Sequence, residues 1–135
     1  MAREPIRNSA IRLLLIDDER VFLEVLVKRL KLRGILPTMA FSGKEGIQLL
    51  RGQSFDVVVL DLKMVDMDGL EVLKIIKIID PHLPVIMLTG HGSEDATSDG
   101  MAGGAYDYLT KPYDLNLLVE KIRQAAAAGR GPDQR

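Results

Sequence analysis

Five polar residues stand at the ends of short apolar runs in this 135-residue sequence, and their side chains suit the binding of a divalent metal ion and a phosphate. Carboxylates are hard oxygen ligands, while an ammonium group and a hydroxyl can donate hydrogen bonds to phosphate oxygens. The five are Asp17 and Asp18 after residues 11–16, Asp61 after 55–60, Thr89 after 84–88, and Lys111 after 106–110.

The apolar runs are predicted to be strands that alternate with helices. Strands are expected over residues 11–16, 35–41, 55–60, 84–88 and 106–110, and helices over 21–33, 42–53, 70–80, 93–104 and 114–128. Five strand–helix units in series predict an α/β fold, in which a mostly parallel sheet has helices on both faces. Ligands of open α/β sheets bind outside the carboxyl ends of the strands, so the five polar residues should converge there.

Local signals place several of these elements. Pro37 cannot donate a hydrogen bond within a sheet, so the strand over 35–41 should lie at an edge. The run from Val57 to Leu60 is apolar throughout, which is typical of a strand buried on both faces. Side chains that cap helices are expected at three starts, and Glu45 completes a capping box with the first of them: Ser42, Ser93 and Asp114.

Three carboxylates crowded at one sheet edge repel one another and need a counter-charge. All-oxygen ligation favours Mg²⁺, for which Mn²⁺ can substitute, and Mg²⁺ prefers one or two carboxylates together with a phosphate. Such a site fits phosphoryl transfer, in which a carboxylate attacks in line while the metal and Lys111 neutralise the phosphoryl oxygens and Thr89 donates a hydrogen bond. Each residue alone is more often a turn or cap residue, so the interpretation rests on their joint placement.

Composition narrows the classes of function. Hydrophobic residues make up 47% and charged residues 27% of the chain, a mixture typical of one globular domain. A formal net charge of −1 gives no indication of nucleic acid or of an anionic membrane as a partner. The sequence has no cysteine, which excludes disulfides and thiol chemistry and fits a cytoplasmic location. Residues 1–10 do not have the pattern of a signal peptide, and the apolar runs are shorter than the ~20 residues of a membrane helix.

Four stretches of sequence occur in a distinctive order: LLLIDDE, VVVLDLKMVDMDGLEVL, Thr-Gly after the fourth strand, and AYDYLTKP. Together they resemble the response regulator receiver domains of bacterial two-component signalling. The resemblance covers residues 11–128. Residues 1–10 are then an N-terminal extension, and residues 129–135 are a tail or the start of a linker.

The resemblance implies roles for individual residues. Asp61 matches the phospho-acceptor, and Asp17 and Asp18 match the acidic pair that holds the metal. Asp18 would bind the metal directly and Asp17 mainly through water, with the backbone carbonyl of Lys63 as a further ligand. Lys111 matches the lysine that pairs with the phosphoryl group.

The resemblance also implies a fold and a switch. The fold is a doubly wound, flavodoxin-like (βα)5 receiver with a five-stranded parallel sheet in the order 2-1-3-4-5, which agrees with the edge position expected from Pro37. The peptide bond between Lys111 and Pro112 is cis in similar proteins. Thr89 and Tyr108 match the switch pair, in which the hydroxyl moves toward the phosphate and the aromatic ring turns inward behind it.

The implied function is a phosphorylation switch, not an enzyme that turns over an outside substrate. A sensor histidine kinase or a phosphotransfer protein would supply the phosphoryl group to Asp61. The surface formed by the fourth helix, fifth strand and fifth helix would then change shape for a downstream protein or an attached effector domain. Neither nucleic acid nor a membrane is expected as a direct partner, while a homodimer is left open.

Other functions are weighed beside this one. The chain fits a receiver fragment of a larger transcriptional regulator or hybrid kinase as well as a free-standing regulator. A receiver that binds partners without phosphate is disfavoured, because every residue that the chemistry needs is present. An aspartate-nucleophile phosphatase is also disfavoured, because such enzymes usually have a second Asp where this chain has Lys63.

The chain departs from the pattern of similar proteins near the expected site. Val65 stands where they usually have Pro, which should loosen the loop after Asp61 without abolishing the chemistry. Lys63 and His91 occupy positions that tune the lifetime of the phosphate in similar proteins, and we expect them to do so here. A plain exposed loop histidine is an equally good interpretation of His91.

Two predicted helices have unusual surfaces. Ile75 and Ile78 share a face of the helix over 70–80 and would form a docking or dimer patch if exposed, although a wider buried face or scattered exposed residues is favoured. The helix over 93–104 is rich in Gly, Ser, Thr and Asp, which are weak helix formers, so high mobility is expected there.

Overall fold

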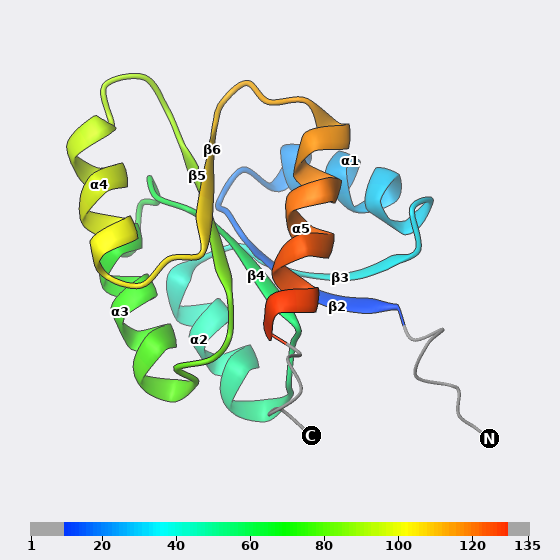
Figure 1. Cartoon of the computed structure of the whole chain (residues 1–135), viewed down its shortest axis with the longest axis horizontal. Coiled ribbons are helices and arrows are strands. Elements are labelled where there is room, and N and C mark those ends of the chain that lie inside the picture. Colours follow the sequence, from blue (N-terminus) through cyan, green and yellow to red (C-terminus); the bar gives the residue numbers. More distant parts are fainter. Residues whose placement is uncertain (1–9, 130–135) are drawn as a thin grey trace.

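The computed structural model describes residues 10–129, in which five strands alternate with five helices (Figure 1). The strands are β2 Ile11–Ile16, β3 Ile35–Ala40, β4 Val57–Asp61, β5 Val85–Thr89 and β6 Asp107–Thr110. The helices are α1 Arg20–Lys31, α2 Gly43–Gly52, α3 Gly69–Ile79, α4 Glu94–Ala102 and α5 Leu115–Gly129. Every predicted element is present, with its ends shifted by a few residues at most.

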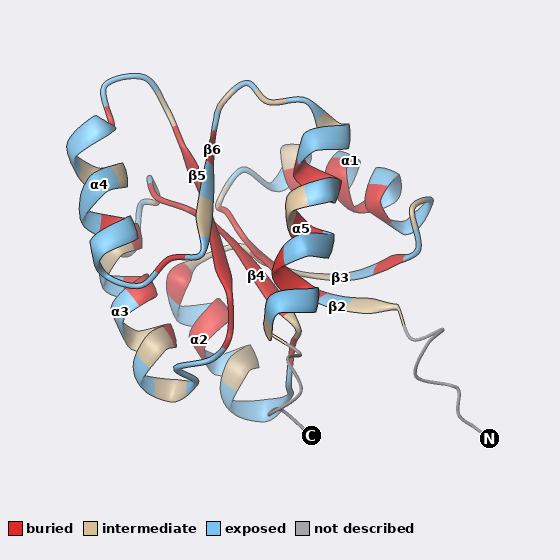
Figure 2. Cartoon of the chain, viewed as in Figure 1, coloured by how far each residue is buried: buried red, intermediate tan, exposed pale blue. Residues whose placement is uncertain are grey.

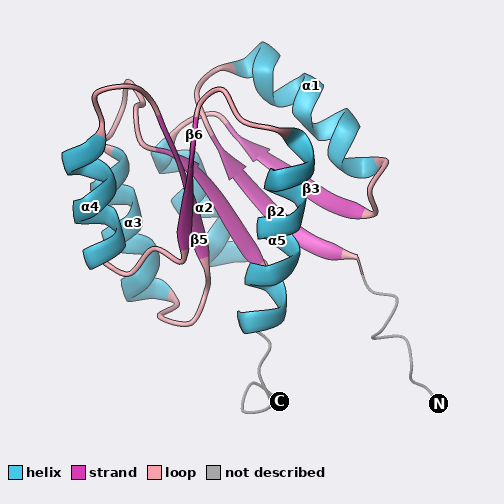
Figure 3. Cartoon of the chain, turned by 45° about the horizontal axis from the view of Figure 1, so that its top comes forward, coloured by secondary structure: helices cyan, strands magenta, loops and turns pink. Residues whose placement is uncertain are grey.

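The five strands form one parallel sheet in the order β3-β2-β4-β5-β6, which is 2-1-3-4-5 along the chain (Figure 3). The predicted order is confirmed. Pro37 lies on the edge strand β3, which pairs with β2 alone. Edge strands tolerate proline, because no strand on their open side needs its N–H. The sequence position of this proline therefore fits the sheet topology.

Helices cover both faces of the sheet, with α1 and α5 on one side and α2, α3 and α4 on the other (Figure 1). Successive residues of the inner strands point to opposite faces, so each strand contributes to two hydrophobic clusters. Val57 and Val59 pack with α1 and α5, while Val58 and Leu60 pack with α2 and α3. β4 and β5 are accordingly buried along their whole length (Figure 2), which holds their carboxyl ends rigidly.

The start of α2 has the predicted capping box in a slightly altered form. The Ser42 hydroxyl accepts a hydrogen bond from the Glu45 N–H at 3.1 Å. The Glu45 carboxylate reaches back to the N–H of Phe41, one residue before the cap, at 2.7 Å. Both interactions satisfy backbone donors that a helix start would otherwise leave unpaired.

The predicted side-chain cap at Ser93 is wrong. Ser93 precedes α4, but its backbone has φ −105° and ψ 23° instead of the extended conformation of a side-chain cap, and its hydroxyl makes no capping bond. Its carbonyl oxygen instead accepts hydrogen bonds from the Thr97 N–H and the Thr97 hydroxyl, both at 2.8 Å. At α5 the carbonyl of Asp114 accepts from the N–H of Leu118 at 3.1 Å, and the side-chain cap expected there stays a prediction.

Ile75 and Ile78 do not form one exposed patch. Ile78 is 74% exposed, but Ile75 is half-buried and packs against the cluster beneath α2 and α3. This arrangement matches the favoured interpretation of a wide buried face with a scattered exposed residue. Gly100 is the buried residue of α4, whose mobility stays a prediction. Within residues 10–129, no helix has both the length and the apolar character that crossing a membrane requires.

Gly69 fixes the loop that follows Asp61. A Cβ at Gly69 would lie 2.5 Å from the backbone Cα of Leu62, and the Gly69 N–H donates to the Leu62 carbonyl at 3.2 Å. The start of α3 can approach the end of β4 this closely only without a side chain at residue 69. The loop between them is thereby closed at its base.

We expect Gly69→Ala to lower the free energy of unfolding by roughly 1–3 kcal/mol, because the added methyl group meets backbone atoms that can move only with β4. Gly52→Ala is the matched control, since a Cβ at this exposed end of α2 meets nothing within 4 Å. Urea unfolding of both variants measures the difference. Equal free energies of unfolding for Gly69→Ala and Gly52→Ala would contradict this prediction, because the loop would then accommodate the added methyl group without cost.

Candidate functional site

The register of the strands brings the predicted site residues together. Ile16 of β2 pairs with Leu60 of β4, so the next residues, Asp17 and Asp61, leave the sheet side by side. On the other side of β4, the Lys111 N–H donates to a β5 carbonyl, that of Thr89, at 2.7 Å. The convergence expected from a parallel sheet is therefore present.

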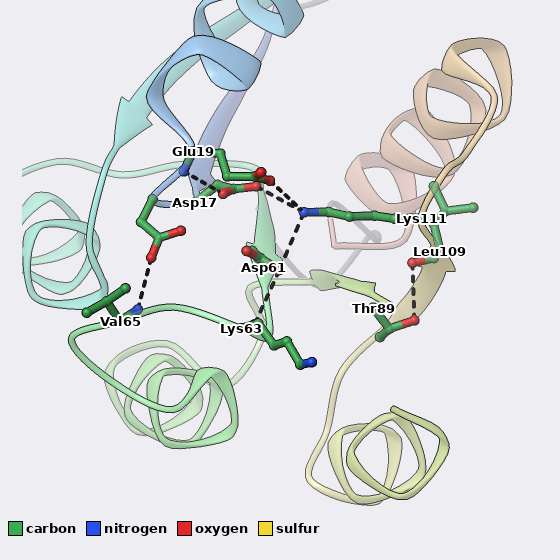
Figure 4. Close-up of polar contacts among 9 residues, drawn as sticks. Asp17, Glu19, Asp61, Lys63, Val65, Thr89, Leu109 and Lys111 are labelled. Atoms are coloured by element: carbon green, nitrogen blue, oxygen red, sulfur yellow. Dashed lines mark hydrogen bonds and ion pairs between the residues drawn. The ribbon is translucent and has the colours of Figure 1, made fainter. Parts of the chain in front are cut away.

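Three carboxylates form the centre of the site. Asp17, Asp18 and Asp61 each have an oxygen within 4.8 Å of the others. Asp17 is 1% exposed and Asp61 is 6% exposed, while Asp18 is half-buried. Each accepts one backbone N–H (Figure 4): Asp17 Oδ1 from Glu19 at 2.9 Å, Asp61 Oδ1 from Lys63 at 3.2 Å, and Asp18 Oδ2 from Val65 at 2.9 Å.

Lys111 supplies the counter-charge. Its Nζ lies 3.5 Å from Asp17 Oδ2, 3.3 Å from Glu19 Oε1 and 3.7 Å from Asp61 Oδ1 (Figure 4). The same Nζ lies 5.3 Å from the centre of the Phe22 ring, within the range of a cation–π contact. One ammonium is thus shared among three acidic side chains, and the cluster keeps a net negative charge.

Burial and crowding alter the proton affinities of these groups. Burial, followed by the charge of Asp17, raises the pKa of Asp61 to about 6, although Lys111 and the N–H of Lys63 oppose this shift. Burial also raises the pKa of Asp17. Burial alone would lower the pKa of Lys111, but the charges of Asp61 and Asp17 outweigh it and raise the value. Protonating a carboxylate or adding a cation would relieve the same repulsion.

The donor set fits a hard divalent cation. The three carboxylates offer only oxygen ligands, which Mg²⁺ and Mn²⁺ prefer. Asp17 Oδ2 is buried and has no hydrogen-bond partner among the described residues. The positive charge beside it is the Lys111 ammonium, at 3.5 Å. A buried carboxylate oxygen of this kind is expected where a metal ion or its water belongs.

The acidic cluster opens into a pocket of about 710 Å³. Asp18, Asp61, Lys63, Val65 and Lys111 are among its lining residues. Thr89 and His91 line a neighbouring hollow of about 430 Å³ together with Tyr108. The Thr89 hydroxyl donates to the carbonyl of Leu109 on β6 at 3.4 Å, and the Tyr108 side chain is 42% exposed.

Several predicted residues therefore occupy different parts of the site. Lys63 borders the pocket of Asp61, and its N–H donates to Asp61 Oδ1. His91 is exposed beside the Thr89 hollow. The peptide bond between Lys111 and Pro112 is cis, the geometry that the family resemblance implies.

The sequence reasoning missed three residues that shape the site. Glu19 binds Lys111, and its place directly after two aspartates was a usable signal. Asp66 ties the loop after Asp61 to the start of α2, which no sequence pattern indicated. The Tyr113 hydroxyl is buried and has no hydrogen-bond partner within residues 10–129, and burial, followed by the charge of Asp17, raises its pKa.

Comparison with known proteins identifies the class of this fold and site. The family model of the response regulator receiver domain matches residues 13–123. The chain belongs to this family. A CheY-like receiver domain protein from Methanospirillum hungatei has a similar structure, with a TM-score of 0.86 and 28% identity, covering 90% of this chain and 98% of that one.

Two curated relatives are longer proteins. The transcriptional regulatory protein ZraR of Salmonella typhimurium is 33% identical over 123 residues, which are 91% of this chain and 28% of the relative. The transcriptional regulatory protein GlrR of Escherichia coli is 38% identical over 118 residues, 87% of this chain and 27% of the relative. The chain thus spans little more than a quarter of the curated relatives that it matches.

We expect Asp61→Asn to stabilise the metal-free protein at neutral pH. A folded-state pKa of about 6 lies above the ordinary 3.8 of Asp, so the stability linked to this carboxyl is present below pH 3.8 and is lost as the pH rises through 6. At about pH 7.5 the neutral amide avoids a cost on the order of 2–3 kcal/mol, and the advantage shrinks toward about pH 5.

Urea unfolding of both proteins in a metal chelator, at the two pH values, measures this difference. Asp80→Asn, which removes a charge at the exposed end of α3, serves as the control and should change little. A native protein as stable as Asp61→Asn at both pH values would contradict the repulsion inferred from the geometry.

Proposed function

We propose that this chain is a Mg²⁺-dependent phosphorylation switch in which Asp61 accepts a phosphoryl group from a sensor histidine kinase or a phosphotransfer protein. One observation carries the proposal: the Asp61 carboxylate, at the end of the central strand β4, borders an open pocket with an ammonium at 3.7 Å and two more carboxylates within ligand distance of a common ion. A nucleophile, a counter-charge and a metal-ligand set thus occupy one place.

The chain's residues have distinct parts in this transfer. An Asp61 oxygen forms a bond to phosphorus while the bond from phosphorus to the donor's imidazole nitrogen breaks, and the imidazole takes up a proton as it leaves. Lys111 holds a phosphoryl oxygen. Asp18, Asp17 through water, and the Lys63 carbonyl would hold Mg²⁺ beside Asp61. The bound ion supplies positive charge for the phosphoryl oxygens.

The switch ends by hydrolysis. A water oxygen bonds to phosphorus, the bond between phosphorus and the Asp61 oxygen breaks, and inorganic phosphate leaves with Asp61 again a carboxylate. Receiver domains generally act as signalling phospho-acceptors, and this self-limited cycle turns over no outside substrate. The phosphatase alternative stays disfavoured, because Lys63 occupies the place of the second Asp and the carboxyl group of that general acid is missing.

Thr89 and Tyr108 are the proposed switch pair. The 3.4 Å hydrogen bond from Thr89 to Leu109 is long and therefore weak, so the hydroxyl can exchange it for a phosphoryl oxygen at little cost. The exposed Tyr108 ring then turns toward the space behind it, and the surface of α4, β6 and α5 changes for a downstream partner or a second copy of the chain.

For the downstream partner, we propose only a class of protein. The curated relatives are named transcriptional regulators, so we propose that this receiver works in such a regulator, with a hybrid kinase or a free-standing regulator as alternatives. Residues 1–9 and 130–135, which include most of the predicted extension and tail, lie outside the described residues. The expected cytoplasmic location stays a prediction of this proposal.

We expect acetyl phosphate with Mg²⁺ to add one phosphoryl group to the native chain, detected by intact-mass spectrometry. A chelator should prevent the gain, because the acidic cluster then repels the anion. Asp61→Ala should show no gain. The matched control Asp68→Ala removes an exposed acid from the same loop and should still be phosphorylated, with a weaker α3 cap.

If acetyl phosphate adds no phosphoryl group, the experiment is repeated with a broad-specificity phosphohistidine donor. No gain in mass from either donor would overturn the proposed function. A gain retained in Asp61→Ala would place the acceptor elsewhere. The donor experiment also separates a kinase-only receiver from one that binds partners without phosphate.

We expect Lys63→Ala to slow loss of the phosphoryl group by about three- to tenfold, a barrier change of about 1 kcal/mol, because it removes a cation that borders the Asp61 pocket. His91→Ala should change the rate less, since His91 lines the neighbouring hollow. Release of inorganic phosphate from the phosphorylated chain measures both rates. An unchanged rate in the double variant would remove both residues from the control of phosphate lifetime.

A further inference from the structure

The loop between β4 and α3 touches the acidic cluster through its backbone. The N–H of Val65 donates a hydrogen bond to Asp18 Oδ2 at 2.9 Å (Figure 4). The Val65 side chain is 95% exposed. Whatever residue 65 contributes to the site, it contributes through its N–H and not through its side chain.

This hydrogen bond depends on the departure of the chain from the family pattern. Proline, which usually stands at this position in similar proteins, has no N–H and could not make the bond. The absence of proline should loosen the loop, as the sequence predicts, but the same change adds a donor that faces Asp18. A bond from an N–H to a carboxylate is among the stronger hydrogen bonds of proteins.

The next residue holds the loop from its other side. Asp66 accepts hydrogen bonds from the N–H groups of Gly43 at 3.0 Å and Lys44 at 3.2 Å, at the start of α2. Although burial alone would raise the pKa of Asp66, these N–H groups lower it, so the carboxylate stays charged. The loop is thus fixed between α2 and Asp18, and the Val65 N–H is directed at its acceptor before any ligand binds.

We propose that the Val65 N–H is a positioning group for Asp18 in the metal site. It holds Oδ2 and so fixes the plane of the carboxylate, which leaves Oδ1 for the ion. Hydrogen bonds to the ligands of a metal, made by groups that do not touch it, commonly orient those ligands and raise affinity. The inference rests on the proposed Mg²⁺ function. It implies that any residue other than proline at position 65 supplies the required N–H.

The test is direct metal binding, with no phosphate present. Mn²⁺ is titrated into the native chain, Val65→Pro and Val65→Ala, and free Mn²⁺ is counted by electron paramagnetic resonance. We expect Val65→Pro to raise the dissociation constant by about tenfold, the lower end of what the loss of an outer-shell partner costs. Val65→Ala keeps the N–H and should bind like the native chain.

A backbone ester separates the N–H from the rigidity of proline. Semisynthesis with α-hydroxyisovaleric acid at residue 65 keeps the valine side chain and replaces only the N–H by oxygen. The ester protein should bind Mn²⁺ as weakly as Val65→Pro does. Urea unfolding in the presence of a chelator checks that the ester protein is folded.

Each outcome decides between the claims. Native-like or tighter binding by the ester overturns the inference, whatever Val65→Pro does, because the N–H would then not assist the ion. Weaker binding by Val65→Ala also overturns it, because the side chain would be responsible. If the native chain binds no Mn²⁺, the proposed function itself is overturned. This outcome is distinct from the other two, in which the native chain binds Mn²⁺ and only the role of the Val65 N–H fails.

Discussion

Mutual repulsion among three carboxylates at the carboxyl edge of one sheet is the interaction on which the rest of this molecule depends. Two unit charges 4 Å apart interact by about 4 kcal/mol at the effective dielectric of a partly buried site. Here Asp17 and Asp61 share one ammonium, that of Lys111, with the further acid Glu19, and Asp18 has an oxygen within 4.8 Å of the other two aspartates. Burial raises the pKa of both Asp17 and Asp61, and the charge of Asp17 raises that of Asp61 further, so the charged form of the cluster is held at a cost in free energy. A cation, a proton or a neutralising substitution relieves it.

A cluster of this kind persists only because the surrounding structure is well packed. The paired residues of β2 and β4 are buried on both faces of the sheet, so these two strands cannot separate to let the carboxylates move apart. Gly69 closes the base of the following loop, and Asp66 fastens its middle to α2. The stability of the core thus offsets the local cost of crowding the carboxylates and keeps them in place for the proposed cation. Preorganisation of this type is what makes charge neutralisation effective at a reacting centre.

Sequence patterns predicted the frame of the site because they report on backbone periodicity. The five apolar runs give parallel strands, and the rule that ligands gather at strand ends places Asp17, Asp61 and Lys111 together before any coordinates are considered. Pro37 even identifies an edge strand. None of this requires knowledge of a side-chain conformation, which is why the positions of these residues were predictable.

The rest could not be predicted, because it depends on backbone angles and close contacts. Ser93 has the right side chain for a cap but the wrong backbone conformation, so its hydroxyl makes no cap. The face of α3 is divided by packing, which half-buries Ile75 and exposes Ile78. The most consequential miss is at Val65, where the sequence indicates only a lost proline, while the structure shows a gained donor to Asp18. Every residue other than proline has a main-chain N–H, so the residue type does not show which acceptor that donor meets.

The charge imbalance also gives a physical reason for the two sides of the site to act together. Lys111 joins them: its ammonium pairs with Asp61 of β4, while its backbone N–H is bound to the carbonyl of Thr89 on β5. Thr89 in turn holds β6 through its weak hydrogen bond to Leu109, next to the exposed Tyr108. A group added at Asp61 changes the partners available to the ammonium and to the Thr89 hydroxyl at the same time. In the proposed switch the Thr89 hydroxyl gives up only this one weak hydrogen bond, so a small gain in binding free energy at the pocket is sufficient to move it. The proposed switch surface is therefore coupled to the same repulsion that a bound metal ion would relieve.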